Sequence, residues 1–255
     1  MKFQMSDIYV EGKLESRDER VTIYLTPNAP LTYDSNKWIY HQMPDRLTFK
    51  ADMLRQQSIH RSHRMYHLKF EFPENIKPDA TMLQFLRSQG FQIGSVELYA
   101  IEAADLRKLK GPRVQIKRVT LENIADYMAV NTPLSLQYGE DYLKESHRLL
   151  HERCQKPTYP LQSYVAYEHA TPVGIMNLIE TDRTVELDGF AVAEHARGRG
   201  IGSSMQVFTG EVADTRPVIL LADAEDTARD MYMKQGYTFM SFQYSVLKEK
   251  SSVLT

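Results

Sequence analysis

The sequence predicts an α+β fold, and three observations lead to this class. From Val114 onward, segments with alternating apolar residues and segments with helical spacing follow one another in a clear order. Three consecutive strands, at 162–169, 172–180 and 185–192, predict an antiparallel meander. A continuous apolar run at 218–222 predicts a buried strand that a helix must cover. The full order is strand, two helices, three strands, glycine-rich turn, helix, strand, helix, strand.

The first elements of this series follow from their periodicity. Residues 114–119 alternate as a strand, whereas residues 121–131 carry apolar side chains at helical spacing. Residues 139–155 form a second predicted helix. The dipeptide Ala170-Thr171 is the predicted turn of the first hairpin in the meander.

The last elements are marked by capping residues. A helix at about 203–213 follows the glycine-rich turn. Asp226-Thr227 are N-cap candidates for the next helix, and Gly236 is well placed as its C-terminal stop. Residues 237–247 then form a long, aromatic-rich closing strand.

Composition fits one large globular domain or two modest ones. The chain has 255 residues, of which 42% are hydrophobic and 25% charged, which is typical of a folded protein rather than a disordered one. Its 31 basic and 33 acidic side chains give a formal net charge of -2. Because no basic excess exists to neutralise phosphates, we expect no nucleic-acid partner.

The cysteine content and the hydropathy predict a cytoplasmic protein. Cys154 is the single cysteine, so an intramolecular disulfide framework is excluded. The first ten residues mix polar with apolar side chains, and no window approaches about 18 uninterrupted apolar residues. We therefore expect neither a signal segment nor a membrane partner.

A short pattern in the first half of the chain returns in the second. Gln89-Gly90-Phe91 matches Gln235-Gly236-Tyr237, and both follow an amphipathic helix and precede a strand. This match suggests an internal duplication. The segment from Lys108 to Arg113 combines charge with two structure breakers and is the predicted linker. We therefore expect two domains, residues 1–110 and 111–255.

A glycine-rich turn is the strongest chemical signal. Residues Arg197-Gly198-Arg199-Gly200-Ile201-Gly202, followed by Ser203, lie between a strand and a helix. Backbone N–H groups at such a helix N-terminus can bind phosphate, and glycine permits positive φ and close approach of a ligand. The spacing matches neither the Walker motif nor the dinucleotide fingerprint, so ATP and NAD are poorly supported.

Two motifs in the right order resemble the GNAT superfamily of N-acetyltransferases. Residues 185–202 resemble its acetyl-CoA-binding motif, Arg/Gln-x-x-Gly-x-Gly/Ala after a strand, with the fixed positions filled by Arg197, Gly200 and Gly202. Residues 228–237 resemble its Ala-x-x-x-Tyr-x-x-x-Gly-Phe/Tyr segment. The order of elements given above is also that of a complete GNAT domain, so the resemblance covers residues 114 to about 248.

The resemblance implies a fold and a ligand. It implies a three-layer arrangement in which helices flank a mixed, mostly antiparallel sheet, with two GNAT-like halves of which the first is degenerate and lacks the acetyl-CoA motif. It also implies acetyl-CoA as co-substrate and no metal. The residues expected to bind acetyl-CoA are Phe190, Ala191, Val192, Arg197, Gly198, Arg199, Gly200, Ile201, Gly202, Ser203 and Glu225, the last of which stands where the family often has asparagine.

Two side chains are the expected catalytic residues. Acetyl transfer needs a neutral amine, a stabilised oxyanion and a proton for the departing thiolate. Glu186 resembles the strand glutamate that is the base in histone-acetylating members, and Asp188 is a rival on the same face; a structural, solvent-facing carboxylate is the alternative. The resemblance places the Tyr232 hydroxyl near the CoA sulfur, and a phenol with a pKa of about 10 can protonate a thiolate. A core aromatic is the alternative for Tyr232, and the Val192 N–H is the expected oxyanion donor.

The sequence therefore predicts an acetyl-CoA-dependent N-acetyltransferase that acts on a primary amine of an unidentified small molecule or peptide by direct attack on the thioester. A non-catalytic CoA- or acetyl-CoA-binding sensor or interaction protein is the alternative, suggested by Glu225 and by the missing N-terminal motif. A different acyl donor, such as succinyl-CoA, is a third interpretation. The exposed aromatic closing strand could also pair with a second copy of the chain to form a homodimer.

Two groups of histidines do not predict a metal site. His60, His63 and His67 have the spacing of one helix face, but no carboxylate or cysteine completes the set, and the interspersed arginines favour a solvated basic face. His147 and His151 have the spacing of a zinc-protease motif without its glutamate.

Overall fold

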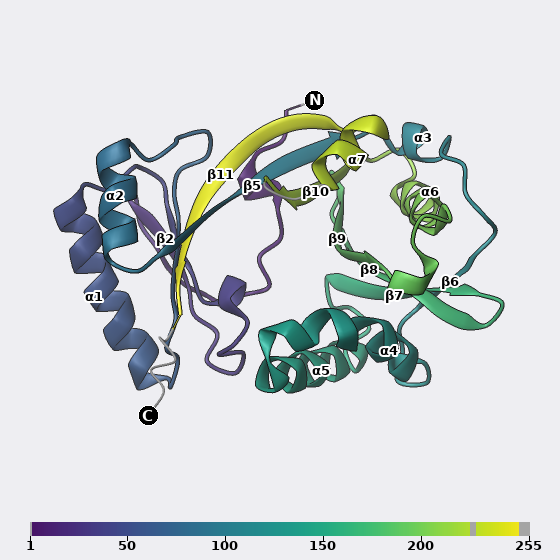
Figure 1. Ribbon diagram of the computed structural model, residues 1–255, viewed down its shortest axis with the longest axis horizontal. Coiled ribbons are helices and arrows are strands. Elements are labelled where there is room, and N and C mark those ends of the chain that lie inside the picture. Colours follow the sequence, from purple (N-terminus) through teal and green to yellow (C-terminus); the bar gives the residue numbers. More distant parts are fainter. Residues whose placement is uncertain (1, 225–227, 250–255) are drawn as a thin grey trace. The chain divides into compact units, whose positions relative to one another are not determined.

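The computed structural model describes residues 2–224 and 228–249 and divides the chain into two compact units (Figure 1). The first unit contains the chain up to Leu98, a short segment that begins at Ala222, and the chain from Met240 onward. The second unit contains residues 99–221 and 228–239. This division differs from the expected boundary at residue 110. The C-terminal strand returns to the first unit because its end pairs there, Ser245 opposite Glu71.

The first unit is a sheet with two helices on one face (Figure 1). Its strand order is β1-β2-β3-β4-β11-β5, with β3 and β4 parallel and the pairs β1/β2, β2/β3 and β4/β11 antiparallel. The elements are β1 (Leu14–Arg17), β2 (Val21–Tyr24), β3 (Trp38–Tyr40), α1 (Arg46–Ser62), β4 (Leu68–Glu71), α2 (Ala80–Ser88) and most of β5 (Gln92–Ile101) and β11 (Thr238–Lys248).

Aromatic packing forms the core of the first unit. Tyr40, Phe49, Phe70 and Phe72 are almost completely buried, and their ring centroids lie 4.9–6.2 Å apart in the contacting pairs. Rings at these separations bury a large apolar area and add specific edge and face contacts. The described residues of this unit contain no glycine-rich turn like that at 197–202.

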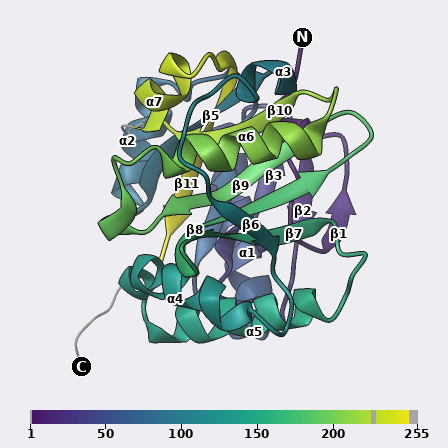
Figure 2. The same ribbon diagram turned by 90° about the vertical axis from the view of Figure 1, so that its right-hand side faces the viewer.

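The second unit has helices on both faces of its sheet (Figures 1 and 2). Helix α6 lies on one face, and α4 and α5 lie on the other. The elements are α3 (Ala103–Leu106), β6 (Gln115–Arg118), α4 (Ile124–Ser135), α5 (Glu140–Cys154), β7 (Leu161–Glu168), β8 (Thr171–Glu180), β9 (Val185–Val192), α6 (Ile201–Ala213), β10 (Val218–Asp223) and α7 (Ala228–Lys234).

The strand pairing of the second unit confirms the predicted class. The order is β10-β9-β8-β7-β6, with antiparallel pairing from β6 to β9 and parallel pairing between β9 and β10. The fold is therefore α+β, with a mixed, mostly antiparallel sheet flanked by helices. The hairpin turn was predicted one residue too late, because the two loop residues are His169 and Ala170, with φ of 47° and 68°. Positive φ at both positions is typical of a type I′ turn, one of the two common two-residue hairpin turns.

The segment from Arg107 to Pro112, which contains most of the predicted linker, is docked along α6. The Arg107 guanidinium donates to the carbonyl oxygens of Gly210 and Asp214, each at 2.7 Å, which satisfies carbonyls at the C-terminal end of the helix. At the other end, the Ser204 hydroxyl donates to the Pro112 carbonyl oxygen at 2.7 Å. The residues just before this segment approach the C-terminal half of α6 closely because Gly210 has no side chain: a Cβ there would lie 2.9 Å from the Ala103 carbonyl oxygen.

Candidate functional site

The glycine-rich turn leads directly into α6. Gly200 is the N-cap residue, with φ 80° in the left-handed region, and Gly198 has φ 72°. A Cβ at Gly198 would meet no described atom within 4 Å, whereas a Cβ at Gly200 would lie 3.2 Å from Pro112 Cδ. Because a glycine cap has no side chain to accept from the first-turn amides, these donors are left for water or a ligand.

Both arginines of the turn are held by neighbouring strands. The Arg197 Nε donates to the Val192 carbonyl oxygen at the end of β9, at 3.1 Å. Arg199 Nη2 donates to both carboxylate oxygens of Glu168 at the end of β7, at 2.6 Å. These contacts fix the turn, and Glu168 balances the charge of Arg199. Ile201 is only 1% exposed, so its side chain anchors α6 in the core, whereas Gly202 and Ser203 are half-buried at its first turn.

Strand β9 separates from β10 before it reaches this turn. Val185 pairs with Val218 and Glu186 with Ile219, and within the described part of the chain the pairing goes no further. Phe190, Ala191 and Val192 are half-buried beyond that point. The Ala193 N–H donates to the Val173 carbonyl oxygen on β8 at 2.9 Å, so the alternation of a strand directs the Val192 N–H to the opposite, open edge.

The side chains of Glu186 and Asp188 on β9 lie on the same face of the sheet, as their spacing of two residues predicts. Glu186 pairs with Ile179 and Asp188 with Asn177 in regular register. Glu186 is 8% exposed, within the part of β9 that is paired on both sides, whereas Asp188 is exposed. The register then shifts between Ile175 and Asn177, which marks a bulge after Asp188.

Tyr232 lies in an aromatic cluster on α7. Its side chain is 8% exposed, and its ring centroid lies 5.3 Å from that of Tyr237 and 6.5 Å from that of Tyr99. This packing fits the core-aromatic alternative. Glu225, together with the N-cap candidates Asp226 and Thr227, lies outside the described residues.

Sequence reasoning missed several buried polar groups of the second unit. The Tyr237 hydroxyl and the Gln206 carbonyl oxygen have no hydrogen-bond partner among the described residues, and burial raises the pKa of Tyr237 above its ordinary value. The Gln206 amide donates to the Gln235 side chain at 2.8 Å and so joins α6 to the end of α7. Asn177 was also missed, although an asparagine inside the apolar run of β8 is a signal that sequence alone provides.

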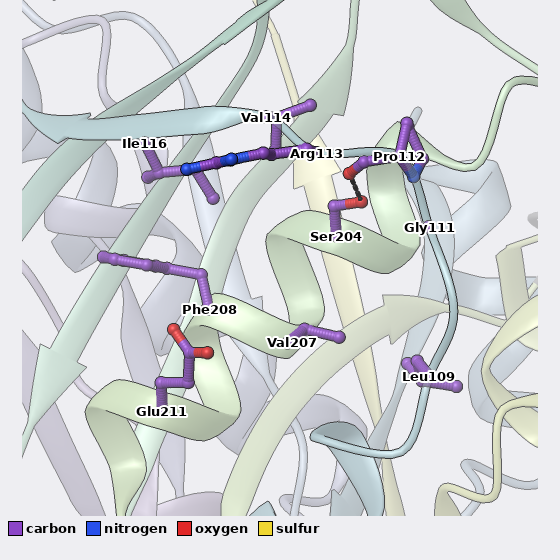
Figure 3. A pocket seen from close by; sticks show the side chains of 10 residues that line it. All are labelled: Leu109, Gly111, Pro112, Arg113, Val114, Ile116, Ser204, Val207, Phe208 and Glu211. Carbon is purple, nitrogen blue, oxygen red and sulfur yellow. Dashed lines mark hydrogen bonds between the residues drawn. The ribbon is translucent and has the colours of Figure 1, made fainter.

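A cavity of about 250 Å³ lies on another side of α6 (Figure 3). It is lined by residues of the docked segment and of α6, mostly apolar, with Arg113 and Glu211 as the charged members. The hydrogen bond from Ser204 to Pro112 closes one end of it (Figure 3). None of the residues predicted to bind acetyl-CoA lines this cavity.

The prediction of a solvated basic face is confirmed for His63 and the arginines, which are exposed, but was wrong for His60 and His67. His60 and His67 are 1% and 2% exposed. His60 lies on the buried face of α1, which ends at Ser62, and His67 reaches the interior from the segment that follows. His60 Nδ1 donates to the His67 carbonyl oxygen at 2.7 Å, and His67 Nε2 donates to the Asn36 carbonyl oxygen at 3.2 Å. Burial lowers the pKa of His67 to about 3.

Residues 2–224 and 228–249 contain neither a cluster of metal-binding side chains nor a helix that could span a membrane. No group of three or more histidine, cysteine, aspartate or glutamate side chains in that part of the chain is placed to hold a metal ion. None of its helices is both long enough and apolar enough to cross a membrane.

Two family models match the chain. An acetyltransferase (GNAT) domain matches residues 160–239, and a domain of unknown function, DUF5613, matches residues 3–99. The first match ends at the last residue of the second unit, and the second ends one residue past Leu98. Among curated proteins, no sequence matches.

Solved structures extend the likeness to nearly the whole chain. A functionally unknown conserved protein from Staphylococcus epidermidis ATCC 12228 is 42% identical over 98% of both chains, with a TM-score of 0.92. A GCN5-related N-acetyltransferase from Kribbella flavida is 14% identical over 95% of this chain and 91% of its own, with a TM-score of 0.62. A tandem GNAT protein from the clavulanic acid biosynthesis pathway is 12% identical over 84% and 75%, with a TM-score of 0.52.

The last two likenesses concern the fold, whereas the family model concerns the sequence of the second unit. Residues 160–239 are therefore a GNAT acetyltransferase domain, and this range contains the motifs on β9, α6 and α7.

Proposed function

We propose that the protein is an acetyl-CoA-dependent N-acetyltransferase, active through its second unit on a primary amine of a small molecule or peptide. The observation that carries the proposal is the combination of the glycine-capped start of α6 with the open edge of β9. Acetyl-CoA contains both a pyrophosphate and an arm with two amide groups. The helix N-terminus suits the first, and a strand edge suits the second.

The glycine turn would hold the pyrophosphate. The backbone of Gly198 to Ser203 supplies amides at the positive end of the α6 dipole. The arginines act here as fixed supports of the turn, since Arg197 is bonded to β9 and Arg199 to Glu168. The open edge at Phe190–Val192 would pair with the amide arm as an added strand does.

The expected chemistry is a direct transfer. The amine nitrogen bonds to the carbonyl carbon of the thioester, the C–S bond breaks, and the proton released by the amine passes to a carboxylate of β9. The Val192 N–H stabilises the carbonyl oxygen as it gains negative charge. The Tyr232 hydroxyl gives its proton to the departing thiolate.

A thiol-release assay tests this proposal. The full chain is incubated with acetyl-CoA and, one at a time, with polyamines, aminoglycosides, lysine-containing peptides and arylalkylamines, and free CoA is measured. We expect saturable release that depends on one amine class, and parallel reactions with succinyl-CoA identify the donor. If calorimetry shows acetyl-CoA binding but no amine supports release, the protein is the non-catalytic CoA-binding sensor instead. Absence of binding would refute both functions.

A further inference from the structure

A chain of hydrogen bonds in the second unit ends on Asp188. The Ser163 hydroxyl on β7 and the Tyr127 hydroxyl on α4 both donate to Asn177 Oδ1 on β8, at 2.8 and 3.4 Å. Asn177 Nδ2 donates in turn to Asp188 Oδ2 on β9 at 3.1 Å. Ser163, Tyr127 and Asn177 are 6–7% exposed, whereas Asp188 is exposed. Three buried groups therefore support one accessible carboxylate.

The chemistry of a carboxylate fixes the donor and the acceptor in each of these hydrogen bonds. An ionised carboxylate only accepts hydrogen bonds, so the amide nitrogen of Asn177 must face Asp188 and its oxygen must face the two hydroxyls. Burial raises the pKa of Tyr127 to about 12, so that hydroxyl stays protonated at neutral pH. The charge of Arg153 on α5 lowers this pKa, and the charge of Asp188 raises it.

Gly189 makes the contact between β8 and β9 possible. Its φ is 53°, and a Cβ at this position would lie 2.6 Å from Asn177 Nδ2. Any other residue would push the amide away from Asp188 or strain the backbone. The bulge and its glycine therefore bring Asn177 and Asp188 together.

The pairing of β9 distinguishes its two carboxylates. Glu186 is paired with β8 and β10 and is buried. Asp188 lies where β9 leaves β10, and Phe190, the first residue of the open edge, follows at a Cα distance of at most about 7 Å for an extended chain. A group bound along that edge would meet Asp188 before Glu186.

We propose that Asp188 is the carboxylate that receives the acceptor amine, and that Asn177 is the positioning residue that holds it. The inference rests on the proposed function. The acceptor enters as an ammonium ion and pairs with the Asp188 carboxylate. It then transfers one proton to that carboxylate, and the neutral nitrogen attacks the thioester. As the C–S bond breaks, the nitrogen releases its second proton, which replaces the proton that Tyr232 gives to the departing thiolate. A fixed anion at this position selects aliphatic, cationic amines over neutral aryl amines.

Kinetics of matched variants test the assignment. With the amine selected by thiol release, Asp188→Asn should lower kcat/KM at pH 7 by about 100-fold or more, while Glu186→Gln should change it by less than about 3-fold. Acetyl-CoA affinity, measured by calorimetry, should stay unchanged in both. The reverse ranking, or a small effect of both substitutions, would overturn the proposal.

A pH profile separates positioning from simple stability. Asn177→Leu removes the donor to Asp188, and a carboxylate without its donor ionises less readily. The acidic limb of the kcat/KM profile should therefore move to higher pH, and Gly189→Ala should move it in the same direction. Ser163→Ala, one step further from the carboxylate, should move it less. Lower rates with an unmoved profile would refute the role of Asn177.

A binding measurement keeps the inference independent of turnover. The side-chain amide signals of Asn177 in a ¹⁵N NMR spectrum, assigned by their loss in Asn177→Leu, are followed during titration with n-butylammonium chloride, with sodium chloride as control. We expect a saturable shift in the wild type and none in Asp188→Asn, even if no amine supports acetyl transfer. An unchanged Asn177 signal in the wild type would overturn the assignment of Asp188.

Discussion

Substitution of Gly200 by alanine should weaken acetyl-CoA binding, destabilise the fold, or divide one loss of free energy between the two. Gly200 has φ 80° and ψ 4°, and an L residue in this left-handed conformation is less stable by roughly 1–2 kcal/mol. A Cβ would also lie 3.2 Å from Pro112 Cδ, closer than ordinary contact. If the turn relaxes without ligand and must return to this geometry on binding, affinity falls by about 5- to 30-fold.

The same strain can appear in folding instead of binding. If the turn keeps its conformation in Gly200→Ala, the free energy of unfolding falls by roughly 1–2 kcal/mol and the affinity changes little. Calorimetric titration with acetyl-CoA and chemical denaturation of the same sample measure both quantities. The loss of binding free energy and the loss of unfolding free energy should together amount to roughly 1–2 kcal/mol.

Two controls make this result specific to the turn. Gly139 caps α5 with φ 98° and no described atom within 4 Å of its Cβ position, so Gly139→Ala should lose stability without loss of affinity. Gly202 is helical, and its Cβ would lie 3.4 Å from Phe190 Cζ, so Gly202→Ala should bind acetyl-CoA normally. A Gly200→Ala protein with wild-type stability and affinity would refute the reasoning, as would equal loss of affinity in Gly139→Ala.

Three more predictions follow from packing and ionisation. Gly210→Ala should destabilise the second unit by about 1–3 kcal/mol in chemical denaturation, although alanine favours a helix, because the Cβ would lie 2.9 Å from both the Ala103 carbonyl oxygen and Leu106 Cβ; a stabilised variant would contradict the observed packing. The stability of the first unit should be full above pH 6.5 and fall toward pH 3, because the pKa of His67 drops from 6.5 to about 3 on folding and the unfolded chain takes up the proton first; denaturation midpoints across this range should vary less in His67→Gln, and an equal slope would exclude His67 as the cause. Tyr237→Phe removes a buried hydroxyl that has no hydrogen-bond partner among the described residues. The free energy of unfolding should therefore stay equal or rise by about 1 kcal/mol, and acetyl transfer should persist. Loss of transfer in a folded Tyr237→Phe protein would show that a ligand uses this hydroxyl.

Local patterns predicted the second unit well. Strands β7, β8 and β9 begin and end within a few residues of the predicted ranges, because alternation and hairpin turns are properties of neighbouring residues. The glycine turn was also found from sequence, since a strand, three glycines and a helix lie together in the chain. The hairpin turn was displaced by one residue because positive φ at His169 and Ala170 has no strong sequence signal.

Long-range pairing was not predictable in this way. The return of β11 to pair with β4 depends on residues more than 170 positions apart, such as Ser245 and Glu71, and no local pattern marks it. The burial of His67 has the same origin, because it is set by the segment after α1, whereas His60 lies on the buried face of α1 with Phe49, Met53 and Gln56. The support of Asp188 by Asn177 required the register of β8 and β9, which the bulge shifts.

Hydrogen exchange of the full chain with and without acetyl-CoA tests the central claim most directly, because it reports binding and its location together. At about one hundred times the dissociation constant, bound ligand stabilises the occupied state by roughly 2.7 kcal/mol, so exchange that requires its release should slow about 100-fold. The account predicts this protection in peptides from Asp188 to Ser204, which contain the open edge of β9 and the glycine turn. Absence of protection there, or protection confined to peptides of the first unit, would contradict it.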